Sequence, residues 1–179
     1  MNTPHPFDVA FRFYNMSYYN RPTTTQYYTR TQMFQDPLCI ICPKDTVLPD
    51  KMLTPADLDP NYQIHQAHYS DSIVLWQKHF PNDIVPRYPM PQNMVDVPRH
   101  FNDPRCWALI YTSVAVYLLT QHPDELSVRY VTPKPDPRTC NLLVSKNCTR
   151  QDILRTLMQC LREYIAEHPT LTNLLPDTI

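Results

Sequence analysis

Two cysteines and two histidines have the residue types and the spacing of a zinc site. Cys39 and Cys42 form a C-x-x-C pair, His65 and His68 form an H-x-x-H pair, and 22 residues lie between the pairs. Thiolates and imidazoles are ligands of tetrahedral zinc, and the histidine spacing would place both rings on one face of a helix. Such a site would be structural and would hold the long loop between the pairs. The alternative interpretation is that the two cysteines are small buried hydrophobic residues beside Ile40 and Ile41.

A second candidate lies at the start of the longest apolar run, residues 106–119, which opens with Cys106 and Trp107. This start resembles papain-like cysteine proteases, in which the nucleophile opens a helix and a histidine follows far downstream. The resemblance implies Cys106 as the nucleophile, with His122 or His168 as the base. A buried, unreactive thiol is the alternative interpretation of Cys106.

A third candidate comes from the order of elements over residues 109–165. An apolar strand, a turn at His122-Pro123-Asp124, a second strand, a proline-rich turn, Cys140 and an amphipathic helix follow one another. This order resembles the second half of a ubiquitin-conjugating (E2-type) domain, which implies Cys140 as the thioester residue. The family's His-Pro-Asn lies after the strand, whereas here His-Pro-Asp precedes it, and the family's glycines are missing. An inactive variant that only binds partners would tolerate these departures.

The composition excludes whole classes of enzyme. The 179 residues include no glycine and 20 prolines, whereas average usage would give about 12 glycines. Phosphate-binding loops, dinucleotide-binding turns and the nucleophile elbow all need glycine, so the sequence contains none of them. Glycine and alanine codons begin with GG and GC, and both residues are scarce. We therefore expect a G-poor coding strand, as in a viral or organellar genome.

Charge and cysteine content bear on partners and compartment. With 16 basic and 17 acidic residues the chain is nearly neutral, so nucleic acid is not an expected partner. The run at residues 106–119 is shorter than the roughly 20 apolar residues that a membrane-spanning helix needs. No secretory signal is recognised at the N-terminus. We therefore expect six reduced cysteines in an intracellular, reducing compartment, with mitochondria and the cytoplasm of a viral host as the two options.

The patterning predicts one α+β domain over residues 1–179, with a small mixed or antiparallel sheet packed by a C-terminal amphipathic helix and with long proline-rich loops. An N-terminal β arm is expected over residues 1–35. Proline-rich loops with one helix and the zinc staple follow over residues 36–105, and core strands with the C-terminal helix over residues 106–179. The run 106–119 is predicted as a strand buried on both faces, with a helix as the alternative.

Individual elements follow from hydrophobic spacing. Alternation predicts strands at residues 7–16 and 126–132. The Thr- and Tyr-rich residues 23–34 and the short run 140–144 are expected to be two further strands. Helical spacing predicts helices at residues 64–80 and after Thr149. Residues 23–34 are expected to be the second arm of a hairpin or a sheet edge. Thr149 is expected to cap the last helix, with Asp152 in its first turn, and His168-Pro169 to end it.

No convergent set of catalytic residues emerges from the sequence. The expected function is therefore a non-enzymatic interaction or adaptor module that contacts other protein subunits in a larger assembly, viral or organellar, with structural zinc as its cofactor. The alternative is a cysteine-dependent enzyme, either papain-like through Cys106 or of the ubiquitin-conjugating type through Cys140.

Overall fold

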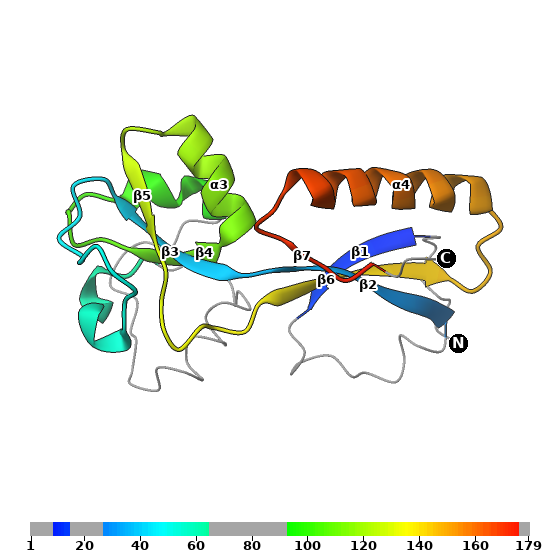
Figure 1. Ribbon diagram of the computed structural model, residues 1–179, viewed down its shortest axis with the longest axis horizontal. Coiled ribbons are helices and arrows are strands. Elements are labelled where there is room, and N and C mark those ends of the chain that lie inside the picture. The colour runs from blue at the N-terminus through cyan, green and yellow to red at the C-terminus, as the bar shows by residue number, and fades with distance from the viewer. Residues whose placement is uncertain (1–8, 15–26, 65–92, 176–179) are drawn as a thin grey trace. The chain divides into compact units, whose positions relative to one another are not determined.

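The computed structural model describes residues 9–14, 27–64 and 93–175, which form the mixed α+β architecture shown in Figure 1. The expected α+β class is confirmed, with two small antiparallel sheets. Contacts group the chain into two compact units. Unit 1 consists of Met1–Asp36 and Pro137–Ile179, and unit 2 consists of Pro37–Asp136. The expectation of a single domain stays a prediction, because two such units can be parts of one domain.

Unit 1 contains a four-stranded sheet with the order β1-β6-β2-β7. Its strands are β1 Val9–Tyr14, β2 Tyr28–Asp36, β6 Arg138–Ser145 and β7 Thr172–Asn173. The predicted strands are confirmed, but the predicted hairpin or edge position of the second strand is wrong. Both β1 and β2 pair antiparallel with β6 and not with each other. β6 takes an inner position, where both of its edges are hydrogen-bonded and five successive residues are buried.

The C-terminal helix α4, Gln151–Glu167, is confirmed where the apolar stripe predicted it. Met158 and Ile165 are buried, and they share a cluster with Phe34 of β2 and with Cys140 and Leu142 of β6. Figure 1 shows α4 lying along one face of the β1-β6-β2 sheet. The helix therefore packs across the strands of unit 1, as its stripe indicated.

The start of α4 differs from the predicted cap. The N-cap is Arg150, and it makes no side-chain cap hydrogen bond. The Arg150 guanidinium instead donates to the carboxylate of Asp152, with Nη2 3.1 Å from Oδ2. Asp152 still places a negative charge in the first turn, where it interacts favourably with the helix dipole.

Unit 2 contains a three-stranded antiparallel sheet with the order β4-β3-β5. The strands are β3 Leu38–Pro43, β4 Ala108–Tyr111 and β5 Leu126–Arg129. The α-helix described in this unit is α3 Thr112–Gln121. Its described 3-10 helices are η1 Pro55–Asp57, η2 Pro60–Tyr62 and η3 Met94–His100. All six residues of β3 are buried. One face of the sheet packs with α3 and η3, and the other packs with Leu48, Leu53 and Leu58 of the loop after β3.

The prediction of one continuous strand at residues 106–119 is wrong, because the run divides into β4 and α3. Tyr111 pairs with Leu38, which is the first residue of β3, so the chain has no further strand partner beyond that point. Both the amide and the hydroxyl of Thr112 donate to the carbonyl oxygen of Pro37, at 2.8 and 2.9 Å. The backbone that follows meets its hydrogen-bonding needs internally by forming a helix.

The segment 36–63 was expected to be loop, and β3 was missed inside it. A six-residue apolar strand flanked by prolines gives too short a periodic signal to separate from a loop with buried residues. The helix predicted at residues 64–80 lies outside the described residues. Within the described residues, no helix combines the length and the apolar character needed to cross a bilayer.

Candidate functional site

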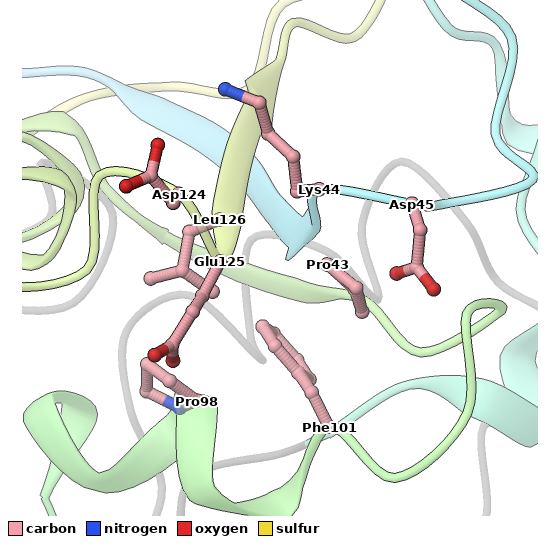
Figure 2. Close-up of a pocket in the computed structure, with 8 residues that line it drawn as sticks. All are labelled: Pro43, Lys44, Asp45, Pro98, Phe101, Asp124, Glu125 and Leu126. Carbon is pink, nitrogen blue, oxygen red and sulfur yellow. The ribbon is translucent and has the colours of Figure 1, made fainter.

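A pocket of about 500 Å³ lies in unit 2, at the end of the β3–β5 strand pair (Figure 2). Its lining consists of Pro43, Lys44, Asp45, Pro98, Phe101, Asp124, Glu125 and Leu126. This volume falls within the range of sites that bind small molecules. The pocket is therefore the candidate site that the described residues offer.

The frame of the pocket is fixed by strand pairing. Pro43, the last residue of β3, lies opposite Leu126, the first residue of β5. The Lys44 amide donates to the Glu125 carbonyl oxygen at 2.8 Å, which extends the ladder by one hydrogen bond. The backbone that carries Lys44 and Glu125 is therefore held by the hydrogen bonds between the two strands.

The apolar part of the pocket comes from η3 and the residue that follows it. The Phe101 amide donates to the Pro98 carbonyl oxygen at 3.1 Å, which closes the last turn of η3. Phe101 is half-buried and packs against the cluster that contains Leu126. In Figure 2 the Phe101 ring and Pro98 lie on one side of the pocket, and the Lys44 ammonium group lies on the opposite side.

Acidic groups outnumber basic groups around the pocket. Three of the eight lining residues are acids, Asp45, Asp124 and Glu125, and one is a base, Lys44. The nearby imidazole Nδ1 of His122 lies 3.2 Å from the Glu125 carboxylate oxygen Oε2. The eight lining residues include no thiol, hydroxyl or imidazole that could act as a nucleophile. The arrangement of charged and apolar side chains is suited to binding a ligand.

The two predicted cysteine ligands lie on opposite faces of β3. Cys42 belongs to the cluster of Leu38 and Ile40, and Cys39 belongs to the cluster on the other face of the sheet. The Cys42 sulfur lies 3.3 Å from the Ser127 hydroxyl, and burial raises the pKa of the Cys42 thiol. Two thiols that point away from each other cannot share one tetrahedral ion.

The expectation of zinc binding therefore has no support in the described residues. No group of three or more histidine, cysteine or acidic side chains that could hold a metal occurs in the part of the chain that the structure describes. His65 and His68 lie outside that part, so their role as ligands, and zinc as a cofactor, remain untested predictions.

The three catalytic candidates lie in different elements, with Cys140 in β6, His168 at the end of α4 and Cys106 before β4. Cys106 belongs to unit 2, and Cys140 and His168 belong to unit 1. Both thiols are buried, and burial raises the pKa of Cys106 and raises that of Cys140 to about 11. His168 Nδ1 lies 2.7 Å from the Tyr164 carbonyl oxygen, to which it must donate, and its ring stacks on that of Tyr164 with centroids 4.1 Å apart. These environments favour unreactive thiols and a structural histidine.

The residues that line the pocket were not singled out from the sequence. Lys44 and Asp45 follow one strand, and Asp124 and Glu125 precede another, so each pair looks like ordinary turn polarity. Their proximity depends on the pairing of β3 with β5, which are more than eighty residues apart in the chain. The pairs of charged residues at the strand ends were a visible feature of the sequence. Such pairs are too common in turns to indicate a binding site.

The class of fold is given by comparison with solved structures. No family model matches the chain, and no curated protein matches its sequence. The regulatory domain of MetR, a LysR family regulator from N. meningitidis, matches with a TM-score of 0.67 and 17% identity over 94% of this chain and 75% of that one. At this identity the likeness shows the fold alone.

Two OxyR structures have the same fold. The reduced regulatory domain of OxyR from Pseudomonas aeruginosa matches with a TM-score of 0.67 and 13% identity, over 87% of this chain and 72% of that one. The H2O2-bound OxyR of Corynebacterium glutamicum matches with a TM-score of 0.61 and 10% identity, over 89% of this chain and 49% of that one. The described fold is thus that of LysR-type regulatory domains.

These findings correct the functional expectations. The predicted adaptor module of a viral or organellar assembly is wrong, because the proteins with this fold are regulatory domains of LysR family regulators. The alternative of a cysteine-dependent enzyme through Cys106 or Cys140 is wrong for the same reason, and the burial of both thiols agrees with that correction. A viral or mitochondrial setting has no support from these neighbours.

Proposed function

We propose that this chain is a regulatory domain that binds a small molecule without transforming it. The observation that carries the proposal is the fold, which matches the MetR regulatory domain with a TM-score of 0.67 over 94% of this chain. One neighbour with this fold, a cysteine-to-serine mutant of OxyR from Corynebacterium glutamicum, was solved with H2O2 bound. The unit 2 pocket, which is lined by charged and apolar side chains, is a place where such a molecule could bind.

The pocket of unit 2 is the ligand site in this proposal. Its apolar side, formed by Phe101 and Pro98, would remove part of a ligand from water, and the surrounding charges would orient it. The hydrogen bond between the Lys44 amide and the Glu125 carbonyl keeps the two charged walls in place. A pocket whose walls are already held costs a ligand less ordering on binding.

The proposal includes other protein subunits as the targets of the signal, since a domain that only binds a ligand must pass the change to another component. Val116 and Tyr117 on α3 offer exposed apolar side chains for such contacts. We also propose a reducing, intracellular compartment, because Cys42, Cys106 and Cys140 are buried as thiols.

The direct test is a fragment screen by nuclear magnetic resonance on isotope-labelled protein, with equal numbers of neutral, anionic and cationic fragments. We expect some fragments to shift the amide signals of Lys44, Asp45 and Glu125 together, because these amides surround one pocket. The variant Phe101→Ala should weaken those fragments. The exposed α4 variant Glu163→Gln is the control and should leave binding unchanged.

Two results would contradict the proposal. One is a screen in which no fragment of any charge shifts the pocket amides. The other is a set of fragments that shift these amides equally in the parent protein and in Phe101→Ala, because such binding would not use the pocket's aromatic side chain.

A further inference from the structure

We infer that unit 1 binds a buried water molecule between the side chains of Thr139 and Asn141 of β6. Both residues belong to a strand that is hydrogen-bonded along both of its edges. Thr139 is 2% exposed and Asn141 is 0% exposed. The water site lies in unit 1, so it is independent of the ligand pocket proposed in unit 2.

Two polar atoms of these side chains have no hydrogen-bond partner within the described residues, the Asn141 carbonyl oxygen Oδ1 and the Thr139 hydroxyl oxygen Oγ1. A hydroxyl can donate to an amide oxygen, but these two atoms make no hydrogen bond with each other. A buried polar group without a partner is unfavourable, and such groups are rare in native proteins. The two atoms therefore need a third group, and that group must donate a hydrogen bond to Asn141.

The two side chains are neighbours on one face of β6, because side chains two residues apart on a strand point the same way. The Asn141 amide nitrogen Nδ2 donates to the Thr139 carbonyl oxygen at 3.0 Å, which turns the Asn141 side chain towards Thr139. This bond needs a donor, so it also fixes Oδ1 as the end of the amide that lacks a partner. Cys140 and Leu142 point the other way, into the cluster packed with α4.

The chemistry and the enclosure of this site select water. Asn141 Oδ1 only accepts, whereas the Thr139 hydroxyl both donates and accepts, so one water molecule can bond both atoms. Buried waters in proteins bridge polar groups of this kind. The burial of both residues leaves no opening for a larger ligand. Gln32 of β2 is opposite Asn141 in the strand register, so it adds a third polar residue to this face.

The first test is Thr139→Val, which removes the hydroxyl and keeps the branched shape of the side chain. A hydroxyl that bonds a water stabilises the fold, so we expect the unfolding equilibrium constant, measured in urea, to rise about tenfold. A hydroxyl without a partner would give the opposite sign, because its removal relieves a desolvated polar group. The control Thr156→Val, on exposed surface of α4, should change the constant by less than about twofold.

The second test looks for the water directly in the parent protein. Nuclear Overhauser cross-peaks, measured in both the laboratory and the rotating frame, distinguish a long-lived bound water from surface hydration. We expect a long-lived contact between water and the Asn141 side-chain amide protons. The amide of exposed Asn61, which donates to Asp59, is the control and should show only short-lived hydration.

Either of two results would overturn the inference. One is a Thr139→Val protein that is as stable as the parent protein or more stable, because its hydroxyl would then have had no partner. The other is an Asn141 amide without a long-lived water contact. If Thr139→Val does not fold, the cross-peaks of the parent protein decide alone.

Discussion

The Arg138 guanidinium donates two hydrogen bonds to the same carboxylate oxygen of Asp36, with Nη2 2.8 Å and Nε 3.1 Å from Oδ2. The Asp36 side chain is 1% exposed and the Arg138 side chain is 18% exposed. The two residues are paired in the register of β2 with β6. This buried charge pair therefore lies at the end of the β2–β6 strand pair.

Removing one partner of this pair should destabilise unit 1. We expect Asp36→Ala to lower the free energy of unfolding by about 3 kcal/mol, because it leaves the Arg138 charge in a desolvated site. Urea denaturation measures the change. The control is Asp50→Ala, whose side chain is 93% exposed and 3.6 Å from Arg129. It should cost about 0.5 kcal/mol or less. Equal costs for the two variants would mean that burial does not strengthen the Asp36 pair.

The packing of α4 on the sheet should depend on the buried members of its stripe. Met158 is 5% exposed and lies in the cluster with Cys140 and Leu142. We expect Met158→Ala to destabilise the protein by about 2 to 4 kcal/mol through the cavity it leaves. Ile153 is 45% exposed, so Ile153→Ala should cost below about 1 kcal/mol in the same urea titration. The reverse order would mean that another face of α4 meets the sheet.

Thiol reactivity should follow burial. Cys160 is exposed on α4, whereas Cys140 is buried and has its pKa raised to about 11, chiefly by desolvation. Only the thiolate reacts with iodoacetamide, and at about pH 8 a thiol with such a pKa is about one part in a thousand ionised. We expect peptide mass spectrometry to show Cys160 modified first and Cys140 modified only on unfolding.

The variant Cys160→Ser is the control for this experiment, and it should remove the fast phase and leave the slow phases as they were. Rapid modification of Cys140 in the folded protein would contradict the burial of the helix-facing side of β6.

Stability in acid should fall as two aspartates of unit 2 become protonated. Asp57 accepts hydrogen bonds from the Thr54 hydroxyl and amide, and Asp103 accepts them from the Arg105 side chain and amide. These contacts lower the pKa of each carboxyl to about 2. Since the folded pKa lies below the ordinary value, the stabilisation is present above about pH 4 and is lost as the pH falls towards 2.

The urea midpoint measured over this pH range tests the acid dependence. The variant Asp57→Asn should be less stable than the parent protein at neutral pH and should lose less of its stability on acidification. An identical pH dependence for the two proteins would show that the Thr54 contacts do not hold the Asp57 carboxylate in its charged form.

Several elements could be predicted from local spacing alone. The apolar stripe from Ile153 to Ile165 predicted α4, and the alternation of residues 126–132 predicted β5, because these signals extend over neighbouring residues. The start of α4 was placed one residue early. The N-cap is Arg150, which pairs with Asp152 and makes no side-chain cap hydrogen bond. A charge pair of this kind has no sequence spacing that would mark it as the start of a helix.

The pairing partners and the candidate site could not be predicted in this way. Asp45 and Glu125 line one pocket because β3 and β5 meet, and residues 106–119 divide at Thr112 because β3 begins at Leu38. Each outcome depends on a strand distant in sequence. Loop-closing entropy and side-chain packing decide such pairings, and neither leaves a local pattern.

By itself the sequence determined the α+β class, the amphipathic C-terminal helix and the absence of every glycine-dependent motif, since composition and short-range periodicity are local properties. Only the tertiary structure decided the faces of the cysteines. Cys39 and Cys42 are close in sequence, but successive side chains of a strand point to opposite faces, so residues three apart are separated by the sheet. The same spacing on a helix would have brought them together, and it was the long-range pairing of β3 with β4 and β5 that made the segment a strand.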